Sequence, residues 1–293
     1  MSERRYNPLA SKQASKQASK QASKQASKQA SKQASKQAPF LPLILHSAEG
    51  EKIMYKELVL QLREERIRAR GYALKHRVIP HRIDKHEIRQ NEKLIRKSVG
   101  QFSTMHEALE HKDSGFTLGH SYRVAIMCYR FALLLKLPGS ERVDMVVSAY
   151  CHDVGKIGVS ESILGKPGLL NDDEYKKMKA HTVHGATLID NMIGSRYVSE
   201  AVLYHHERWD GKGYPAGLAG EAIPFAARVI SVFDSLDAMI GNRKYRKNLD
   251  LFDAREQLKK NAGAMYDPSI VAACISNWGF LVGGLYGETP LKK

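Results

Sequence analysis

Apolar residues recur at helical spacing along residues 99–293, and no stretch shows the alternating pattern of a surface strand. A helix after Thr117 would carry an apolar stripe of Val124, Met127, Cys128, Phe131 and Leu135. Further helices are expected over residues 141–152, 172–192, 196–205, 224–240, 250–261 and 268–278. The sequence therefore predicts an all-α fold, with a helical bundle as the body of the chain.

The formal charge of +15 is unevenly distributed along the 293 residues. Residues 11–38 contribute +7 and residues 61–98 contribute another +7, whereas residues 99–293 carry only +1. Strong basicity usually suggests a nucleic-acid partner, but here it lies ahead of the region that carries the chemistry described below. We expect no nucleic-acid binding, and charge is a poor guide to the substrate.

Residues 11–38 are seven copies of Ser-Lys-Gln-Ala. A period of four drifts against the 3.6-residue helical turn, so no apolar face is built, and residues 1–38 are expected to be a disordered repeat tail. The tract can be encoded by a repeated AGCA tetranucleotide, which leads to the hypothesis that slippage makes expression phase-variable. An ordinary low-complexity linker is the alternative.

Residues 39–98 are predicted to be a basic helical segment, divided by Pro80. Charged amphipathic helices of this type pack on a neighbouring domain or dimerise, and a homodimer through residues 52–98 is one expectation. No sensor domain is recognisable in residues 1–98, so the input signal is not indicated. Residues 99–293 are expected to form the catalytic domain.

Cysteine and hydropathy patterns bear on the compartment. The three cysteines are odd in number and have no CxxC spacing, which argues against a disulfide framework and a thiolate zinc site. The N-terminus lacks the apolar core of a signal peptide, and the long uncharged stretch 268–287 contains polar residues and glycines. We expect a cytoplasmic protein without a membrane span.

Eight of the twelve histidines lie between residues 106 and 206. Imidazoles together with carboxylates suit Fe, Mn or Ni better than a structural zinc. His152-Asp153 is the sharpest local signal, because the two oxygens of Asp153 could bridge two ions. Gly155 then turns the chain, and Lys156 could counter the charge of a phosphate.

Several stretches occur in an order that is specific to one group of proteins. They include His120-Ser-Tyr-Arg-Val, His152-Asp-Val-Gly-Lys-Ile-Gly, His205-His-Glu-Arg-Trp-Asp-Gly-Lys-Gly-Tyr-Pro and Asp234-Ser-Leu-Asp-Ala. Over about residues 103–280 the chain resembles the HD-GYP subgroup of HD-domain phosphohydrolases. The resemblance implies an HD-domain helical bundle and a cyclic di-GMP phosphodiesterase that yields pGpG, GMP or both in bacterial signalling of biofilm and motility.

The resemblance also implies a site with two divalent metal ions, Fe or Mn in the first place and Ni as a further option. The ligands of the first ion would be His120, His152, Asp153 and Asp234, and those of the second Asp153, His181, His205 and His206. Asp153 and Lys156 would serve catalysis, and the substrate would be bound by Lys156, Arg243, Arg246, Gly213 and Tyr214. Diguanylate cyclase proteins are implied as partners through the loop that contains Gly213-Tyr214-Pro215, called the GYP loop below.

Some members of this family bind a third metal through a glutamate at the position that is Phe116 here, so we expect a two-metal site. The nearest alternative substrate is 3′,3′-cGAMP. An alternative of another class is a signalling module that binds a cyclic dinucleotide or a diguanylate cyclase without turnover. A third alternative is an HD-domain nucleotidase. The segment from His205-His-Glu to Gly213-Tyr-Pro argues against it, because HD enzymes outside the HD-GYP subgroup lack this segment.

Overall fold

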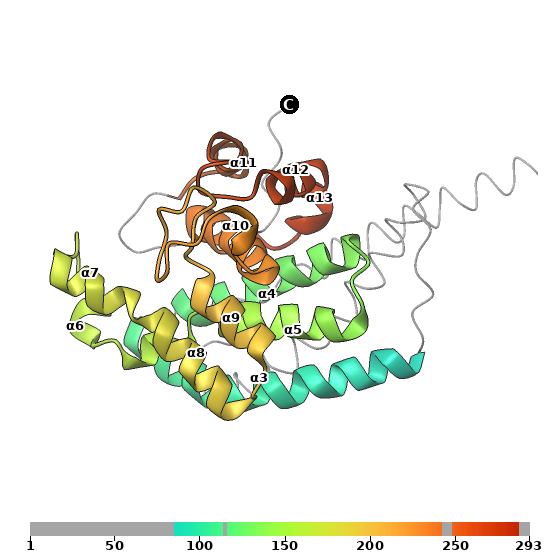
Figure 1. The fold of residues 1–293 in the computed structure, drawn as a ribbon, viewed down its shortest axis with the longest axis horizontal. Coiled ribbons are helices and arrows are strands. Elements are labelled where there is room, and N and C mark those ends of the chain that lie inside the picture. The colour runs from blue at the N-terminus through green and yellow to red at the C-terminus, as the bar shows by residue number, and fades with distance from the viewer. Residues whose placement is uncertain (1–84, 114–115, 242–247, 287–293) are drawn as a thin grey trace, which may run out of the picture. The chain divides into compact units, whose positions relative to one another are not determined.

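The structure is a computed structural model that describes residues 85–113, 116–241 and 248–286. Within these ranges the chain is helical, and β-structure is limited to two isolated bridges, Asp210 with Ala219 and Ala262 with Tyr266 (Figure 1). The predicted all-α fold is confirmed. The repeat tail, most of the basic segment, and Arg243 and Arg246 lie outside the described residues, as does the side chain of Phe116.

The elements follow one another along the chain, and the longest connection within the described residues lies between residues 204 and 220. In order they are α3 (Lys85–Asp113), α4 (Phe116–Leu134), α5 (Gly139–Cys151), the 3-10 helix η1 (Val154–Gly158), α6 (Glu161–Leu164), α7 (Asp172–Lys179), α8 (His181–Met192), α9 (Arg196–Tyr204), the 3-10 helix η2 (Gly220–Ala222), α10 (Phe225–Ile240), α11 (Leu251–Lys260), α12 (Pro268–Ser276) and α13 (Trp278–Leu281).

The core forms where α4, α5, α9 and α10 pack together, and α3 packs against α4 and α5 (Figure 1). Four members of the predicted apolar stripe are buried, but Leu135, just past the end of α4, is 41% exposed. The three cysteines are free and buried, each in this core. Burial of so many apolar side chains is the main stabilising contribution to such a bundle.

The helix α3 passes through the predicted domain boundary at residues 98 and 99 without interruption. Ile95, Val99 and Phe102 of α3 are all buried in the common core. At least the last part of the basic segment therefore packs on the helical body. The boundaries themselves stay a prediction.

The single helix expected over residues 172–192 is wrong, because the chain divides into α7 and α8 at Ala180. The carbonyl groups of Met178 and Lys179 accept hydrogen bonds from the side chains of His181 and Thr182. Side chains that bond to carbonyls in this way compete with the helical ladder. The break positions His181, as described below.

The predicted helix over residues 268–278 ends at Ser276, and a separate short helix, α13, follows.

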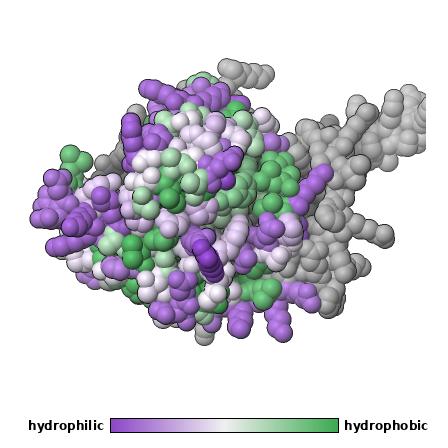
Figure 2. Space-filling view, in the orientation of Figure 1, coloured by the Kyte–Doolittle hydropathy of each residue, from purple (hydrophilic) through white to green (hydrophobic). Residues whose placement is uncertain are grey.

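In the part of the chain that the structure describes, no helix has the length and apolar character that crossing a membrane requires. Figure 2 shows that the edge formed by α6 and α7 is largely hydrophilic.

Candidate metal centre

Three of the predicted ligand histidines stand at the C-terminal ends of helices. His152 and His205 directly follow α5 and α9, and His181 follows α7 after one residue. In each, Nδ1 lies within hydrogen-bond distance of the carbonyl oxygen three residues earlier: 2.8 Å to Ala149, 2.7 Å to Met178 and 2.7 Å to Val202, respectively.

This arrangement has two consequences. The last carbonyl groups of a helix have no intrahelical partner, and here the imidazole satisfies one of them. Since a carbonyl can only accept, Nδ1 must carry the proton, which leaves the lone pair on Nε2. The helix ends thus aim three lone pairs at one region.

His120, on α4, is held differently. Its Nδ1 lies 2.7 Å from Oδ2 of Asp237 on α10, a carboxylate that also accepts from Arg123 at 2.6 and 2.9 Å and from the hydroxyl of Tyr286 at 2.5 Å. Asp237 is fully buried. It orients His120 and does not face the metal centre, which is the carboxylate–histidine support common at metal sites.

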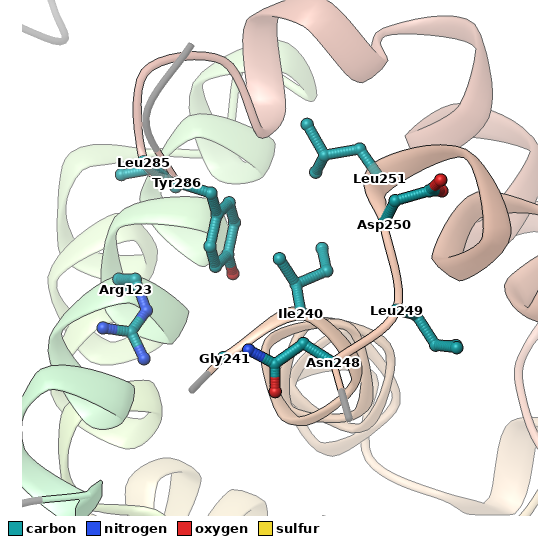
Figure 3. Close-up of a pocket in the computed structure, with 9 residues that line it drawn as sticks. All are labelled: Arg123, Ile240, Gly241, Asn248, Leu249, Asp250, Leu251, Leu285 and Tyr286. Carbon is teal, nitrogen blue, oxygen red and sulfur yellow. The ribbon is translucent and has the colours of Figure 1, made fainter. Parts of the chain in front are cut away.

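Arg123 and Tyr286 also line a pocket of about 360 Å³ (Figure 3). The pocket is bounded by the end of α10, the start of α11 and the segment after α13. Asp237 of α10 is thus held by Arg123 of α4 and by Tyr286 of the segment after α13. The side chain of Arg123 is 20% exposed, whereas the side chain of Asp237 has no exposed surface.

The first predicted ligand group converges around Nε2 of His120. This nitrogen lies 3.2 Å from Nε2 of His152 and 3.0 Å from Oδ1 of Asp234, and Oδ2 of Asp153 is 3.5 Å from Nε2 of His152. Two ligand atoms bound to one ion at about 2.1 Å, at right angles, are about 3 Å apart. The spacing fits a shared cation.

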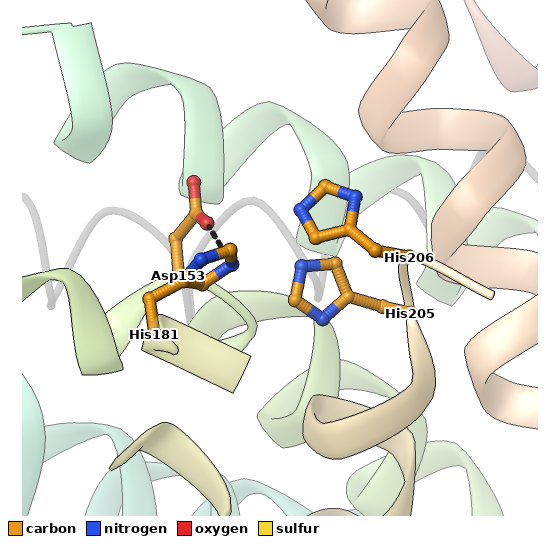
Figure 4. A group of neighbouring side chains, drawn as sticks. All are labelled: Asp153, His181, His205 and His206. Carbon is orange, nitrogen blue, oxygen red and sulfur yellow. Dashed lines mark ion pairs between the residues drawn. The ribbon is translucent and has the colours of Figure 1, made fainter. Parts of the chain in front are cut away.

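The second group consists of Asp153, His181, His205 and His206, whose ligand atoms all lie within 4.8 Å of one another (Figure 4). Oδ1 of Asp153 is 3.5 Å from Nε2 of His181, whereas Oδ2 faces the first group. One carboxylate thus presents an oxygen to each group, as a bridging ligand would.

The burial of the histidine nitrogens indicates whether these residues suit a metal ion. Nε2 of His181 and Nε2 of His205 are buried, and neither has a hydrogen-bond partner among the described residues. A buried polar atom without a partner costs about 1–3 kcal/mol. A cation that accepts both lone pairs removes this cost, so the donor set fits a divalent metal.

The charges also suit a cation. Burial alone would raise the pKa of Asp153, but Lys156 and the surrounding imidazoles hold it well below its ordinary value. Burial lowers the pKa of His206 to about 3, and burial and the adjacent imidazoles hold that of His205 well below its usual range. Ionised carboxylates and neutral imidazoles are the protonation states that bind metals.

His120 is the exception among the imidazoles. Burial favours its neutral form, but hydrogen bonds to Asp234 and Asp237 outweigh burial and raise its pKa to about 9. In the free protein this ring holds a proton between the two carboxylates. A cation held by His120 and Asp234 would displace that proton, so metal binding would release it.

Lys156 reaches the centre from η1. Its Nζ lies 2.6 Å from Oδ2 of Asp153, and its side chain is 21% exposed. A Cβ atom at Gly155 would lie 1.9 Å from the carbonyl oxygen of His181 and 2.4 Å from the amide nitrogen of Gly185. Only glycine allows η1 to pack this closely on α8, which brings Lys156 and His181 to the same site.

The GYP loop folds back on the two adjacent histidines. The buried carboxylate of Glu207 accepts from the amides of Ala216 at 2.7 Å and Gly217 at 3.0 Å. A Cβ atom at Gly213 would lie 2.4 Å from Cα of Glu207, so the close approach requires glycine. The following peptide, Tyr214–Pro215, is cis, and the ring of Tyr214 stacks on His206.

The structure therefore brings together all seven predicted metal ligands, and it places Lys156 and Tyr214 beside them. A glycine is required at position 213 by the close approach to Glu207, whether or not Gly213 contacts the substrate. The supporting roles of Arg123 and Tyr286 were missed. Arg123 stands in the quoted His120-Ser-Tyr-Arg-Val stretch, one turn from His120, but its partner Asp237 is 114 residues away and nothing local pointed to it.

A comparison with known families matches residues 90–270 to the HD domain model. The chain belongs to the HD domain family. Relatives include a cyclic di-GMP phosphodiesterase of Thermotoga maritima, 36% identical over 53% of this chain and 42% of the relative, and the cyclic di-GMP phosphodiesterase response regulator RpfG of Xanthomonas campestris, 34% identical over 74% of this chain and 56% of the relative. The predicted family is confirmed.

A third relative is the 3′3′-cGAMP-specific phosphodiesterase 2 of Vibrio cholerae, 35% identical over 55% of this chain and 31% of the relative. A crystal structure of a cyclic GMP-AMP specific phosphodiesterase of V. cholerae covers 60% of this chain and 50% of its own, with 17% identity and a TM-score of 0.45. The chain spans about half or less of the length of the three curated relatives described here.

Proposed function

We propose that the protein is a metal-dependent phosphodiesterase that hydrolyses cyclic di-GMP to pGpG, GMP or both in bacterial second-messenger signalling. The observation that carries the proposal is the buried carboxylate of Asp153, whose two oxygens face two separate groups of imidazoles. Such a site suits a phosphoester, and several relatives are named as cyclic di-GMP phosphodiesterases.

The proposed cofactor is a pair of divalent ions, Fe or Mn, with Ni as a further option, because the donor set combines imidazoles with carboxylates and contains no thiolate. His120, His152 and Asp234 would hold one ion, His181, His205 and His206 the other, and Asp153 both. When bound, a two-metal pair lowers the pKa of a water and clamps the phosphoryl oxygens of an in-line displacement.

The chain's own contribution is to position and neutralise. The helix-end histidines keep their protons on Nδ1, so the lone pairs on Nε2 remain free for ligation. Lys156 places an ammonium beside Asp153, where it can pair with a phosphate oxygen of the substrate and with the charge that develops in the transition state. Arg243, Arg246, Gly213 and Tyr214 remain proposed substrate contacts.

Hydrolysis of 3′,3′-cGAMP is the second candidate, because relatives with that specificity are 33–37% identical to this chain. A cytoplasmic location, a homodimer through residues 52–98 and diguanylate cyclase partners at the GYP loop complete the proposal. Phase-variable expression through the repeat is tested by reading the gene, since mixed synonymous codons in the seven copies would exclude it.

The test of the function uses anaerobically prepared protein loaded with Fe or Mn. Cyclic di-GMP and 3′,3′-cGAMP are supplied separately, and the products are separated by chromatography. We expect hydrolysis of cyclic di-GMP by the wild type and a loss of at least a thousandfold in Asp153→Ala. Equal rates in the two proteins would overturn the mechanism, and binding without hydrolysis would identify a non-catalytic module.

A further inference from the structure

A row of aromatic rings leads from the metal centre to the surface. Tyr214 lies on His206 with ring centroids 4.9 Å apart and an interplanar angle of 27°. The ring of Tyr175, on α7, meets Tyr214 edge-on, with a centroid distance of 6.5 Å and an angle of 77°. Because His206 belongs to the second ligand group, this row begins where a substrate phosphate would lie.

A cation lies over the same rings. Lys179 follows Tyr175 by four residues and so stands on the same face of α7. Its Nζ is 4.9 Å from the ring centroid of Tyr175 and 5.7 Å from that of Tyr214, both within the range of a cation–π contact. The two tyrosines and the ammonium form one connected set.

Packing does not account for Tyr175. Its side chain is 49% exposed, and α7 contains no buried residue. Charged residues surround it on this short helix, in agreement with the hydrophilic edge in Figure 2. A single exposed aromatic residue is ordinary, but one that contacts a second tyrosine stacked on a metal-site histidine is not explained by chance exposure.

We propose that Tyr175 and Lys179 form a binding platform for one guanine base of the cyclic dinucleotide. The base takes the place of the Lys179 ammonium over the exposed ring of Tyr175, and the displaced Nζ donates to the O6 and N7 acceptors at the edge of the base. Adenine presents an amino group in place of O6, so this contact favours guanine. The platform rests on the proposed function and adds the residues that select the base.

The first test measures base stacking in the metal-loaded full chain. Tyr175→Leu keeps an apolar side chain but removes the ring, Tyr175→Phe keeps the ring, and Phe252→Leu changes another exposed aromatic residue, on α11. Calorimetry with the slowly hydrolysed phosphorothioate analogue of cyclic di-GMP gives Kd, and steady-state kinetics with cyclic di-GMP gives KM and kcat.

We expect Tyr175→Leu to raise Kd and KM by about tenfold with a much smaller change in kcat, whereas Tyr175→Phe and Phe252→Leu stay within threefold of the wild type. A change in Kd below threefold for Tyr175→Leu overturns the platform. The platform is also overturned if Tyr175→Phe loses as much affinity as Tyr175→Leu, because the ring would then not be the binding element.

The second test measures base selection. The ratio of the Kd of cyclic di-AMP to that of cyclic di-GMP is expected to fall by about fivefold in Lys179→Met, and an unchanged ratio contradicts the role of Lys179. Failure of the wild type to bind or hydrolyse either cyclic di-GMP or 3′,3′-cGAMP would instead refute the proposed function. The two failures are therefore distinguishable.

Discussion

Replacing Asp237 tests whether the metal centre depends on the support behind His120. The carboxylate is fully buried and accepts four hydrogen bonds, two of them from the guanidinium of Arg123. Removing one partner of a buried ion pair costs about 3–5 kcal/mol, and the partial exposure of Arg123 favours the lower end. At about 2–4 °C per kcal/mol for a domain of this size, Asp237→Ala should lower Tm by about 6–12 °C.

The same substitution should weaken metal binding by about 10–100-fold, because His120 loses the carboxylate that orients its ring. Calorimetric unfolding gives Tm, and competition with a chromogenic chelator gives the metal affinity. Asp210→Ala is the matched control, since Asp210 also forms a two-point pair with an arginine, Arg208, but at the surface. If Asp237→Ala changes Tm and metal affinity no more than the control does, the argument about the support is refuted.

Three other changes test separate parts of the structure. Gly155→Ala should prevent η1 from packing on α8, so thermal unfolding followed by circular dichroism should give a Tm well below that of the wild type. An unchanged Tm would mean that η1 and α8 can separate enough to admit the methyl group. Asp267 caps α12 and pairs with Arg228, and its pKa is lowered despite burial. Its stabilising contribution is therefore present above the unfolded-state pKa of about 4 and is lost as pH falls through the lower folded-state pKa, so urea unfolding of Asp267→Asn should depend less on pH below about 4. Chelation should lower Tm by leaving Nε2 of His181 and His205 unpartnered, and Mn²⁺ should restore it; a Tm that ignores the chelator contradicts the metal site.

The proposed ligand residues could be picked out from the sequence because they stand in short motifs. His152-Asp153 and His205-His206 each lie at a helix end, where a residue can bond to the carbonyl three positions earlier. This hydrogen bond joins residues three apart in the sequence, so a short motif is enough to specify it. The apolar stripe of α4 was likewise predictable from spacing, except at Leu135, which lies past the helix end.

What could not be predicted depends on contacts between distant parts of the chain. The bond between Arg123 and Asp237 joins α4 to α10, and Tyr286 reaches the same carboxylate from the C-terminal segment. No local pattern encodes these pairs. The break at Ala180 was missed for another reason, because helical spacing continues through it while side-chain bonds to two carbonyls divide the helix.

The most direct test of a metal-dependent phosphodiesterase is a titration of hydrolysis against metal. Metal-free protein receives increasing equivalents of Mn²⁺ or Fe²⁺ under anaerobic conditions, and the initial rate of cyclic di-GMP cleavage is recorded at each point. The proposed site predicts no cleavage without metal and a rate that rises until about two ions are bound per chain. Cleavage that is independent of added metal, or no cleavage at any metal content, would contradict it.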